Sequence, residues 1–221
     1  MNAAETISFE IPPLRISETG EKALKWMDEF RVSHLPVLDK QNHYIGLVSE
    51  ENILDMEDQK MPLSSISSNF VTPFIYEDAH MFEMMRLVGE LKITVVPVLS
   101  KDNEYLGATP MLHLMKIISK MSSVVENGSI IVLEMSRHDY SLAEIAQLVE
   151  SNDAKILSSY ITSEPDSTLL NVTIKVNKLN VDAILQTFVR YSYNIVASYH
   201  QSRMQDDMKR RFEELMKYIK M

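Results

Sequence analysis

Hydrophobic and polar positions in the first half of the chain repeat at an offset of 61 residues. The apolar run 34–38 aligns with 95–99, and Tyr44–Gly46 aligns with Tyr105–Gly107. Short polar stretches, 39–42 and 100–103, separate the two apolar runs in each copy. Apolar runs separated by polar turn residues predict strand, tight turn, strand in both copies.

Helical periodicity precedes each predicted hairpin. Apolar residues recur there at i, i+4 and i+7; they are Ala23, Met27 and Phe30 in the first copy, and Met84, Val88 and Leu91 in the second. A further short apolar helix is expected behind each hairpin, over 51–56 and 111–118. One helix–strand–strand–helix unit is too small to bury its sheet alone, so we expect the two copies to pack about a pseudo-two-fold axis.

The pattern changes beyond a polar junction at 119–128. Strands are predicted over 129–135, 155–162, 170–176 and 194–199, with helices over 142–149 and 181–190. This order, β-α-β-β-α-β, is that of a ferredoxin-like split unit. The sequence therefore predicts an α+β protein with repeats at 1–58 and 59–122, a ferredoxin-like domain at 128–200 and a C-terminal helix at 201–221.

The C-terminal segment 201–221 carries an apolar stripe at helical spacing, formed by Met204, Met208, Phe212, Leu215 and Ile219. Such a stripe predicts an amphipathic helix that docks on the chain's own domains or on another chain, and we favour docking within a homodimer. Acidic residues lie among its basic ones, including Asp206 and Glu213, and they argue against binding to a membrane surface.

Composition narrows the classes of partner and location. The formal net charge of −9 over 221 residues disfavours nucleic acid, because phosphate binding needs clustered Lys and Arg. The absence of cysteine excludes disulfides, thiolate catalysis and cysteine-rich zinc sites. The first ten residues lack the basic start and apolar core of a signal peptide, and no apolar run is long enough to span a bilayer. We therefore expect a soluble cytoplasmic protein with no membrane partner.

A motif surrounds each predicted hairpin. In the first copy h-x-h-x-P-V occupies Val32–Val37, and G-h-h-[ST]-x-x-[DN] occupies Gly46–Asn52. The motif resembles the CBS repeat, and the resemblance covers about 9–119 in two copies. It implies a tandem pair that forms one disc-like module with two clefts. In this family the clefts often bind adenine nucleotides (AMP, ADP, ATP) or adenosyl compounds such as S-adenosylmethionine.

The resemblance places a ribose site in the first copy. Ser49 ends a strand and opens a helix, where backbone N–H groups lack partners, and Asn52 lies one turn further on. Pro36 and Gly46 belong to the same motif and are included in the predicted site. An alternative stays open, because Ser-x-x-polar at a helix start is also an N-cap that needs no ligand.

The second copy departs from the family pattern at the same positions. Pro110 replaces Ser49 and His113 replaces Asn52, with Thr109 expected as the cap of the following helix. His113 could touch a phosphate, although a lone histidine beside leucines is also consistent with a structural role. The second cleft is therefore expected to be degenerate, so that a nucleotide would bind through the first copy.

Further ligand contacts are predicted from the strand before each Pro-Val pair. This strand should form an apolar wall for a purine, and the matching residues are Val32, His34, Ile93 and Val95. For each of these residues taken singly, ordinary core packing is the alternative interpretation. Arg15, on the strand that opens the first copy, is the nearest candidate by sequence for a cation that contacts phosphate.

The second half resembles a different family. With 141–146 following its first strand, the segment 128–200 is similar to an ACT domain, and the whole chain to acetoin-utilisation-type CBS/ACT proteins. The resemblance implies dimerisation through the sheets and amino-acid binding where the first strand turns into the first helix. Tyr140 stands where ACT domains usually carry glycine, and a bulky side chain there argues against close approach of a ligand to the backbone.

No catalytic motif is visible. The chain lacks G-x-S-x-G, Walker and Rossmann signatures, and its six histidines show no metal-ligand spacing. We therefore expect a non-catalytic regulatory sensor without cofactor or metal. It would bind an adenine nucleotide or adenosyl compound in the CBS-pair cleft and signal through a homodimer to an unknown protein partner. The alternatives are a scaffold protein with degenerate clefts and an amino-acid sensor that uses the ACT-like domain.

Overall fold

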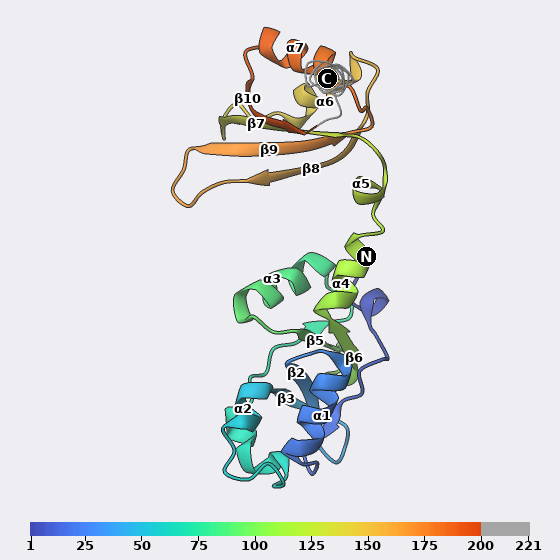
Figure 1. Ribbon diagram of the computed structural model, residues 1–221, viewed down its shortest axis with the longest axis vertical. Helices are drawn as coiled ribbons and strands as arrows, with labels where there is room; N and C mark the ends of the chain where they lie inside the picture. Colours follow the sequence, from blue (N-terminus) through green and yellow to red (C-terminus); the bar gives the residue numbers. More distant parts are fainter. Residues whose placement is uncertain (200–221) are drawn as a thin grey trace, which may run out of the picture. The chain divides into compact units, whose positions relative to one another are not determined.

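A computed structural model describes residues 1–199, and the predicted helix at 201–221 lies outside them. The described residues form two compact units, of which the first is Met1–Ser119 and the second begins at Lys120 (Figure 1). Both combine helices with separate sheets, which confirms the predicted α+β class. Within residues 1–199, no helix is both long and apolar enough to cross a membrane.

The first copy forms a three-stranded sheet with two helices. Its elements are β1 (Leu14–Arg15), α1 (Gly20–Phe30), β2 (His34–Leu38), β3 (Tyr44–Ser49) and α2 (Glu50–Leu54). The sheet order is β1-β2-β3, with β1 parallel to β2 and β2 antiparallel to β3. Helix α1 begins where the Thr19 side chain accepts a hydrogen bond from the Lys22 N–H, and it buries Ala23 and Met27 against the sheet.

The second copy repeats this arrangement 61 residues later. Its elements are β4 (Ile75–Tyr76), α3 (Met81–Leu91), β5 (Val95–Leu99), β6 (Tyr105–Pro110) and α4 (Met111–Ile118), with sheet order β4-β5-β6. The left-handed residue that ends the first long helix recurs as well, with φ 54° at both Arg31 and Lys92. The predicted repeat is thus confirmed at the level of single residues.

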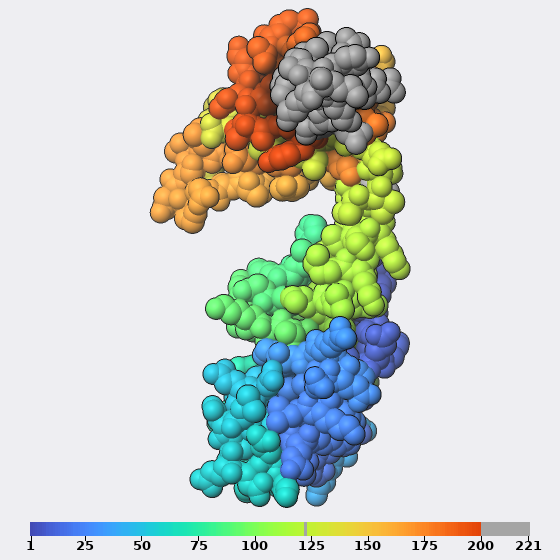
Figure 2. Space-filling view, viewed as in Figure 1, coloured from blue at the N-terminus to red at the C-terminus, as the bar shows by residue number. Residues whose placement is uncertain are grey.

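Each copy is completed by the segment that comes just before the other copy in the sequence. Residues 1–8, which include the 3-10 turn Ala4–Thr6, pack on the second copy, where Ser8 N–H donates to the Ala108 carbonyl at 3.0 Å. Figure 2 shows this segment in dark blue against that copy. Residues 61–71, which include the 3-10 turn Leu63–Asn69, return to the first copy, where Leu47 N–H donates to the Val71 carbonyl at 2.8 Å. The boundary predicted at 58/59 therefore divides the sequence repeat but not the packing.

Two glycines provide a test of this packing. A Cβ added to Gly46 would lie 2.8 Å from the Val71 carbonyl oxygen, whereas one added to Gly89 would meet nothing within 4 Å. We expect Gly46→Ala to lower the free energy of unfolding by about 1–3 kcal/mol, because backbone must move to relieve the clash. Gly89→Ala should raise it by roughly 0.5–1 kcal/mol, because Gly89 lies inside α3. Urea unfolding followed by circular dichroism measures both, and a neutral Gly46→Ala would mean that residues 70–71 are easily displaced.

The second unit is a four-stranded antiparallel sheet with two helices. A short helix α5 (Ser122–Val125) precedes β7 (Ser129–Ser136), α6 (Leu142–Glu150), β8 (Ile156–Thr162), β9 (Leu169–Val176), α7 (Asp182–Arg190) and β10 (Asn194–Tyr199). The sheet order is β10-β7-β9-β8, so the predicted β-α-β-β-α-β arrangement is confirmed.

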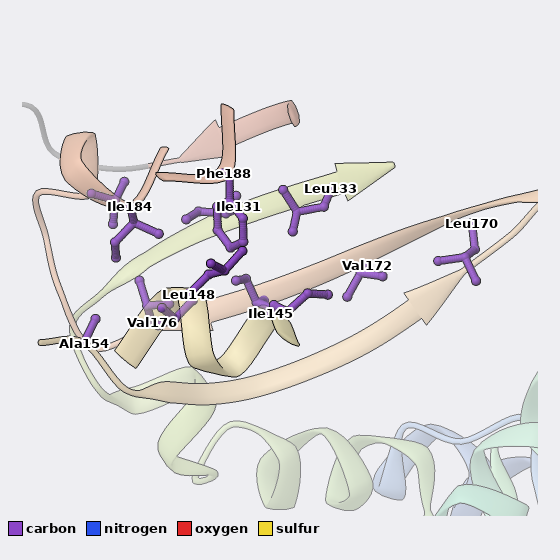
Figure 3. Close-up of a cluster of buried hydrophobic side chains, with 13 residues drawn as sticks. Ile131, Leu133, Ile145, Leu148, Ala154, Leu170, Val172, Val176, Ile184 and Phe188 are labelled. Carbon is purple, nitrogen blue, oxygen red and sulfur yellow. The ribbon is translucent and has the colours of Figure 1, made fainter. Parts of the chain in front are cut away.

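The core of the second unit lies on one face of this sheet. Alternate residues of β7 and β9, such as Ile131 and Ile174, are fully buried against Ile145 of α6 and Phe188 of α7 (Figure 3). Because successive side chains of a strand point to opposite faces, the residues between them belong to the other face of the sheet. Both helices cover the first face only (Figure 1).

Candidate functional site

A cavity of about 250 Å³ lies where the two copies of the first unit meet. The first copy contributes the end of α1 and the residues after it, including Arg31 and Val32. The second copy contributes Thr94, just before β5, and the first turns of α4, including His113 and Lys116. A molecule bound in this cavity would therefore contact both copies at once.

The charges that line the cavity are mixed. Arg31, His113 and Lys116 line it together with Glu10 and Glu29. Arg31 ends α1 in the left-handed conformation, with its N–H bonded to the carbonyls of Asp28 and Met27. Arg31 and Lys116 place two cationic groups in the lining, and the His113 ring adds nitrogens that can form hydrogen bonds with a ligand.

Helix α4 begins at the same cavity. Pro110 is its N-cap and supplies no side-chain hydrogen bond, while the Met111 N–H donates to the Thr94 carbonyl at 2.9 Å. The prediction that Thr109 caps this helix is wrong. The Thr109 side chain turns inward, where its hydroxyl donates to the Thr6 carbonyl at 3.1 Å. The exposed start of α4 thus adds N–H groups that favour an anion.

Ser49 and Asn52 satisfy each other at the start of α2. The Asn52 N–H donates to the Ser49 hydroxyl at 3.0 Å, and the Ser49 N–H donates to the Asn52 side-chain oxygen at 3.2 Å. This pair is a capping box, so the structure supports the capping alternative. Both oxygens that were expected to accept ribose hydroxyls already accept backbone hydrogen bonds, and neither residue lines the 250 Å³ cavity.

Most residues of the predicted apolar wall for a purine lie in the hydrophobic core of the first unit. Val32 is 8% exposed and lines the cavity. Ile93 and Val95, by contrast, are buried in the hydrophobic clusters of the first unit. Pro36 and Gly46 are also buried, and Gly46 lies beneath the backbone of Val71. Packing therefore accounts for these residues, and Val32 is the member of the wall that reaches a cavity.

Arg15 is directed elsewhere. Its guanidinium donates to the Asp39 carbonyl at 3.0 Å and so supports the hairpin turn of the first copy. Arg31, which sequence reasoning missed, lines the cavity instead. No local pattern pointed to Arg31. It ends α1 in the left-handed conformation, and an arginine side chain does not reveal that backbone conformation in advance.

His34 joins the two copies through Thr94. The Ser33 N–H donates to the Thr94 hydroxyl oxygen at 3.0 Å, and that hydroxyl lies 3.2 Å from His34 Nδ1. The Thr94 N–H also faces Nδ1, at 3.4 Å. With an N–H directed at it, Nδ1 acts as an acceptor, which assigns the ring proton to Nε2 of a neutral imidazole. Thr94 lies at the Ser33 position of the second copy and was not singled out from sequence.

Protonation of His34 is expected to weaken the first unit. Burial lowers the pKa of His34 below its ordinary value of 6.5, so the unfolded chain takes up the proton first as the pH falls. The stability contributed by His34 is therefore complete above pH 6.5 and is lost as the pH falls from 6.5 toward the lowered pKa. Urea unfolding measured between pH 8 and 5 should show this loss, and His34→Asn, which keeps an acceptor but does not titrate, should show a shallower loss. Equal slopes would contradict the assignment.

A second cavity, of about 340 Å³, lies in the second unit at the turn between β7 and α6. Glu134, Asp139 and Glu144 line it together with Tyr193, and burial and Glu144 raise the pKa of Tyr193 to about 12. Tyr140 packs against the neighbouring core and is only partly exposed. Three carboxylates would repel the carboxylate of a free amino acid. Within residues 1–199, no group of three His, Cys, Asp or Glu side chains is arranged to hold a metal ion.

Comparison with known proteins finds one family match and several partial relatives. Residues 8–57 match the family described as CBS domain. Two proteins of Methanocaldococcus jannaschii match part of the chain. An inosine-5'-monophosphate dehydrogenase is 19% identical over 114 residues, and the match covers 52% of this chain and 23% of the enzyme. An uncharacterised protein is 21% identical over 131 residues, with 56% and 59% covered. The chain thus spans less than two thirds of either relative.

Solved structures match about half of the chain. A CBS domain pair/ACT domain protein from Thermotoga maritima shares 20% identity at a TM-score of 0.47, and the match covers 53% of this chain and 96% of that structure. CBSX2 in complex with AMP shares 16% identity at a TM-score of 0.47, with 55% and 98% covered.

Proposed function

We propose that this chain is a non-catalytic regulatory sensor that binds an adenine nucleotide or a related adenosyl compound between its two CBS-like copies. The observation that carries the proposal is the 250 Å³ cavity lined by both copies and by Arg31, His113 and Lys116. Its volume lies slightly below the ~300–1,000 Å³ usual for drug-sized ligands, which favours a mononucleotide over a dinucleotide.

The lining supplies both kinds of contact that such a ligand needs. Val32, Ile11 and Phe30 give an apolar surface for a base, and the basic side chains with the start of α4 give a site for phosphate. In this proposal the ligand lies at the start of α4 in the second copy, in contrast to the expectation that the first copy carries it. The departure from the family motif at Pro110 and His113 then changes the site without removing it.

Ligand binding would act on the contact between the copies. Thr94 lines the cavity and also bonds to Ser33 and His34, so a ligand beside Thr94 would favour one arrangement of the two copies. Helices α3 and α4 carry exposed apolar side chains, which support a proposed homodimer or protein partner as the recipient of the signal; they are Phe82, Met85, Met111, Leu112 and Met115.

The second unit is proposed to serve dimerisation as an ACT-like domain. The acidic lining of its cavity, Glu134, Asp139 and Glu144, disfavours the alternative of amino-acid sensing. The scaffold alternative and the sensor differ in ligand binding, because a scaffold would bind no small ligand.

Titration with AMP, ADP, ATP and S-adenosylmethionine tests the sensor. A ligand at 100 times its Kd should stabilise the chain by about 2.7 kcal/mol, or about 5–10 °C in melting temperature. Calorimetry should give one site per chain. The absence of binding and of any shift across all four compounds would contradict the sensor and leave the scaffold.

A further inference from the structure

The pseudo-symmetry of the first unit is broken in the segments that lead into the two copies. Leu47 of β3 and Ala108 of β6 are equivalent positions, because they lie one repeat offset of 61 residues apart. Leu47 forms an isolated bridge with Val71, so strict symmetry would place residue 10 opposite Ala108. The residue that forms this bridge is Ser8 instead. The segment that enters the first copy is therefore displaced by two residues.

The register returns at the next strands. Leu14 of β1 and Ile75 of β4 are again one repeat offset apart, and they pair with equivalent residues of β2 and β5. Leu14 follows Ser8 by six residues, whereas Ile75 follows Val71 by four. The chain accommodates the two extra residues in a turn at residues 9–10. The first copy thus carries a short insertion that the second copy lacks.

This insertion lies at the edge of the 250 Å³ cavity. Glu10 and the following Ile11 both line the cavity. On its N-terminal side the turn is anchored at Ser8, whose N–H donates to the Ala108 carbonyl at 3.0 Å. Phe9 lies in the turn between this anchor and the lining residues. Because consecutive Cα atoms are about 3.8 Å apart, the Phe9 side chain starts within one residue of the cavity lining.

Phe9 makes little contact with the rest of the protein. It is 87% exposed, more than any other large apolar side chain that the structure describes. A phenylalanine can bury on the order of 150 Å² or more, and removing that surface from water is favourable. The ring therefore gains free energy from any apolar partner that reaches the cavity.

The comparison between the copies favours a role for the turn in binding over a role in folding. The shorter segment 71–75 leads into β4, which pairs with β5 as β1 pairs with β2. The two extra residues before β1 are therefore not needed to form the strand. An insertion that the fold does not require, placed beside a cavity that both copies line, is accounted for by contact with a ligand.

We propose that the Phe9 ring folds over the cavity and stacks on the base of the bound adenosyl ligand, an inference that rests on the proposed function. Ile11, Phe30 and Val32 supply an apolar surface for one face of the base, and Phe9 would cover the other face. The carboxylate of Glu10 would repel a phosphate, so the base is the part of the ligand that lies beside this turn.

Calorimetric titration of the full chain with AMP, ADP, ATP and S-adenosylmethionine tests this role. For the tightest of the four compounds, Phe9→Ala should raise Kd about tenfold, because the base loses a stacking partner. The melting temperature without ligand should stay unchanged, since a ring that is 87% exposed stabilises the folded chain little. Phe74→Ala is the matched control. Phe74 lies in the shorter segment of the other copy and does not line the cavity, so Kd should stay within about twofold.

Tryptophan fluorescence provides an independent readout of stacking. Trp26 is the single natural tryptophan, and Trp26→Phe removes its emission while keeping an aromatic ring. In that background Phe9→Trp should lose emission intensity as the same ligand is added, because a stacked base quenches indole emission. Phe74→Trp in the same background should keep its intensity.

The outcomes separate this inference from the proposed function. If the wild-type chain binds one of the four compounds but Phe9→Ala leaves Kd unchanged, the stacking role is wrong and the proposed function stands. Constant emission from Phe9→Trp at saturating ligand would also overturn the stacking role. If the wild-type chain binds none of the four compounds, the proposed function and this inference both fail.

Discussion

A chain carrying Arg31→Glu is expected to bind the tightest of AMP, ADP and ATP about 100-fold more weakly than the wild-type chain. The change removes a cation from the cavity and adds a carboxylate beside Glu29. A hydrogen bond to a charged group contributes about 1.5–3 kcal/mol, and 1.4 kcal/mol corresponds to tenfold in Kd. Calorimetric titration at constant ionic strength measures the effect.

The pseudo-symmetry of the fold supplies the control. Lys92 ends α3 in the second copy in the same left-handed conformation in which Arg31 ends α1 in the first. Lys92 does not line the 250 Å³ cavity. Lys92→Glu should therefore change stability to the same small extent as Arg31→Glu and leave Kd within about twofold, as expected of an exposed site outside the cavity. The reverse outcome, with Lys92→Glu weakening binding and Arg31→Glu neutral, would overturn the proposed position of the ligand.

Deletion of residues 2–8 is expected to unfold much of the second copy. Ala3 and Thr6 have no exposed surface, and the Ala3 N–H donates to the Ala79 carbonyl at 2.8 Å. The deletion would uncover Met84 and leave the buried hydroxyl of Thr109 without Thr6. Opening a core cluster and stranding a buried polar group together cost on the order of 3–5 kcal/mol, a large share of the ~5–15 kcal/mol that stabilises a typical domain.

Hydrogen exchange locates this loss. Amides of α3 and β6 should lose protection in the deleted chain, while those of α1 and β2 should keep more of theirs, because residues 61–71 still cover the first copy. Phe9→Ala is the matched control, since Phe9 is 87% exposed and should alter the free energy of unfolding by less than about 0.5 kcal/mol. Equal loss of protection in both copies would show that the N-terminal segment is not specific to the second.

The candidate site was predictable in part. The offset of the repeat located the helix starts at Ser49 and Pro110, and it identified His113 and Val32 as residues near a cleft. Sequence could not decide between a cap and a ribose contact for Ser49, because a hydroxyl at a helix start serves either purpose. The decision came from the Asn52 side chain, which reaches back to the Ser49 backbone.

By itself the sequence determined the repeat and the order of the main helices and strands in both units, but not the short helix α5, which lies within the predicted polar junction. These features depend on local turn chemistry and on the period of apolar residues, both of which are written along the chain. Only the tertiary structure decided that Ser8 pairs with Ala108, that Arg31 reaches the cavity in place of Arg15, and that Thr94 connects Ser33 and His34. Such contacts join residues about 60–100 positions apart, and no local pattern fixes which distant backbone or side chain will be within hydrogen-bonding distance.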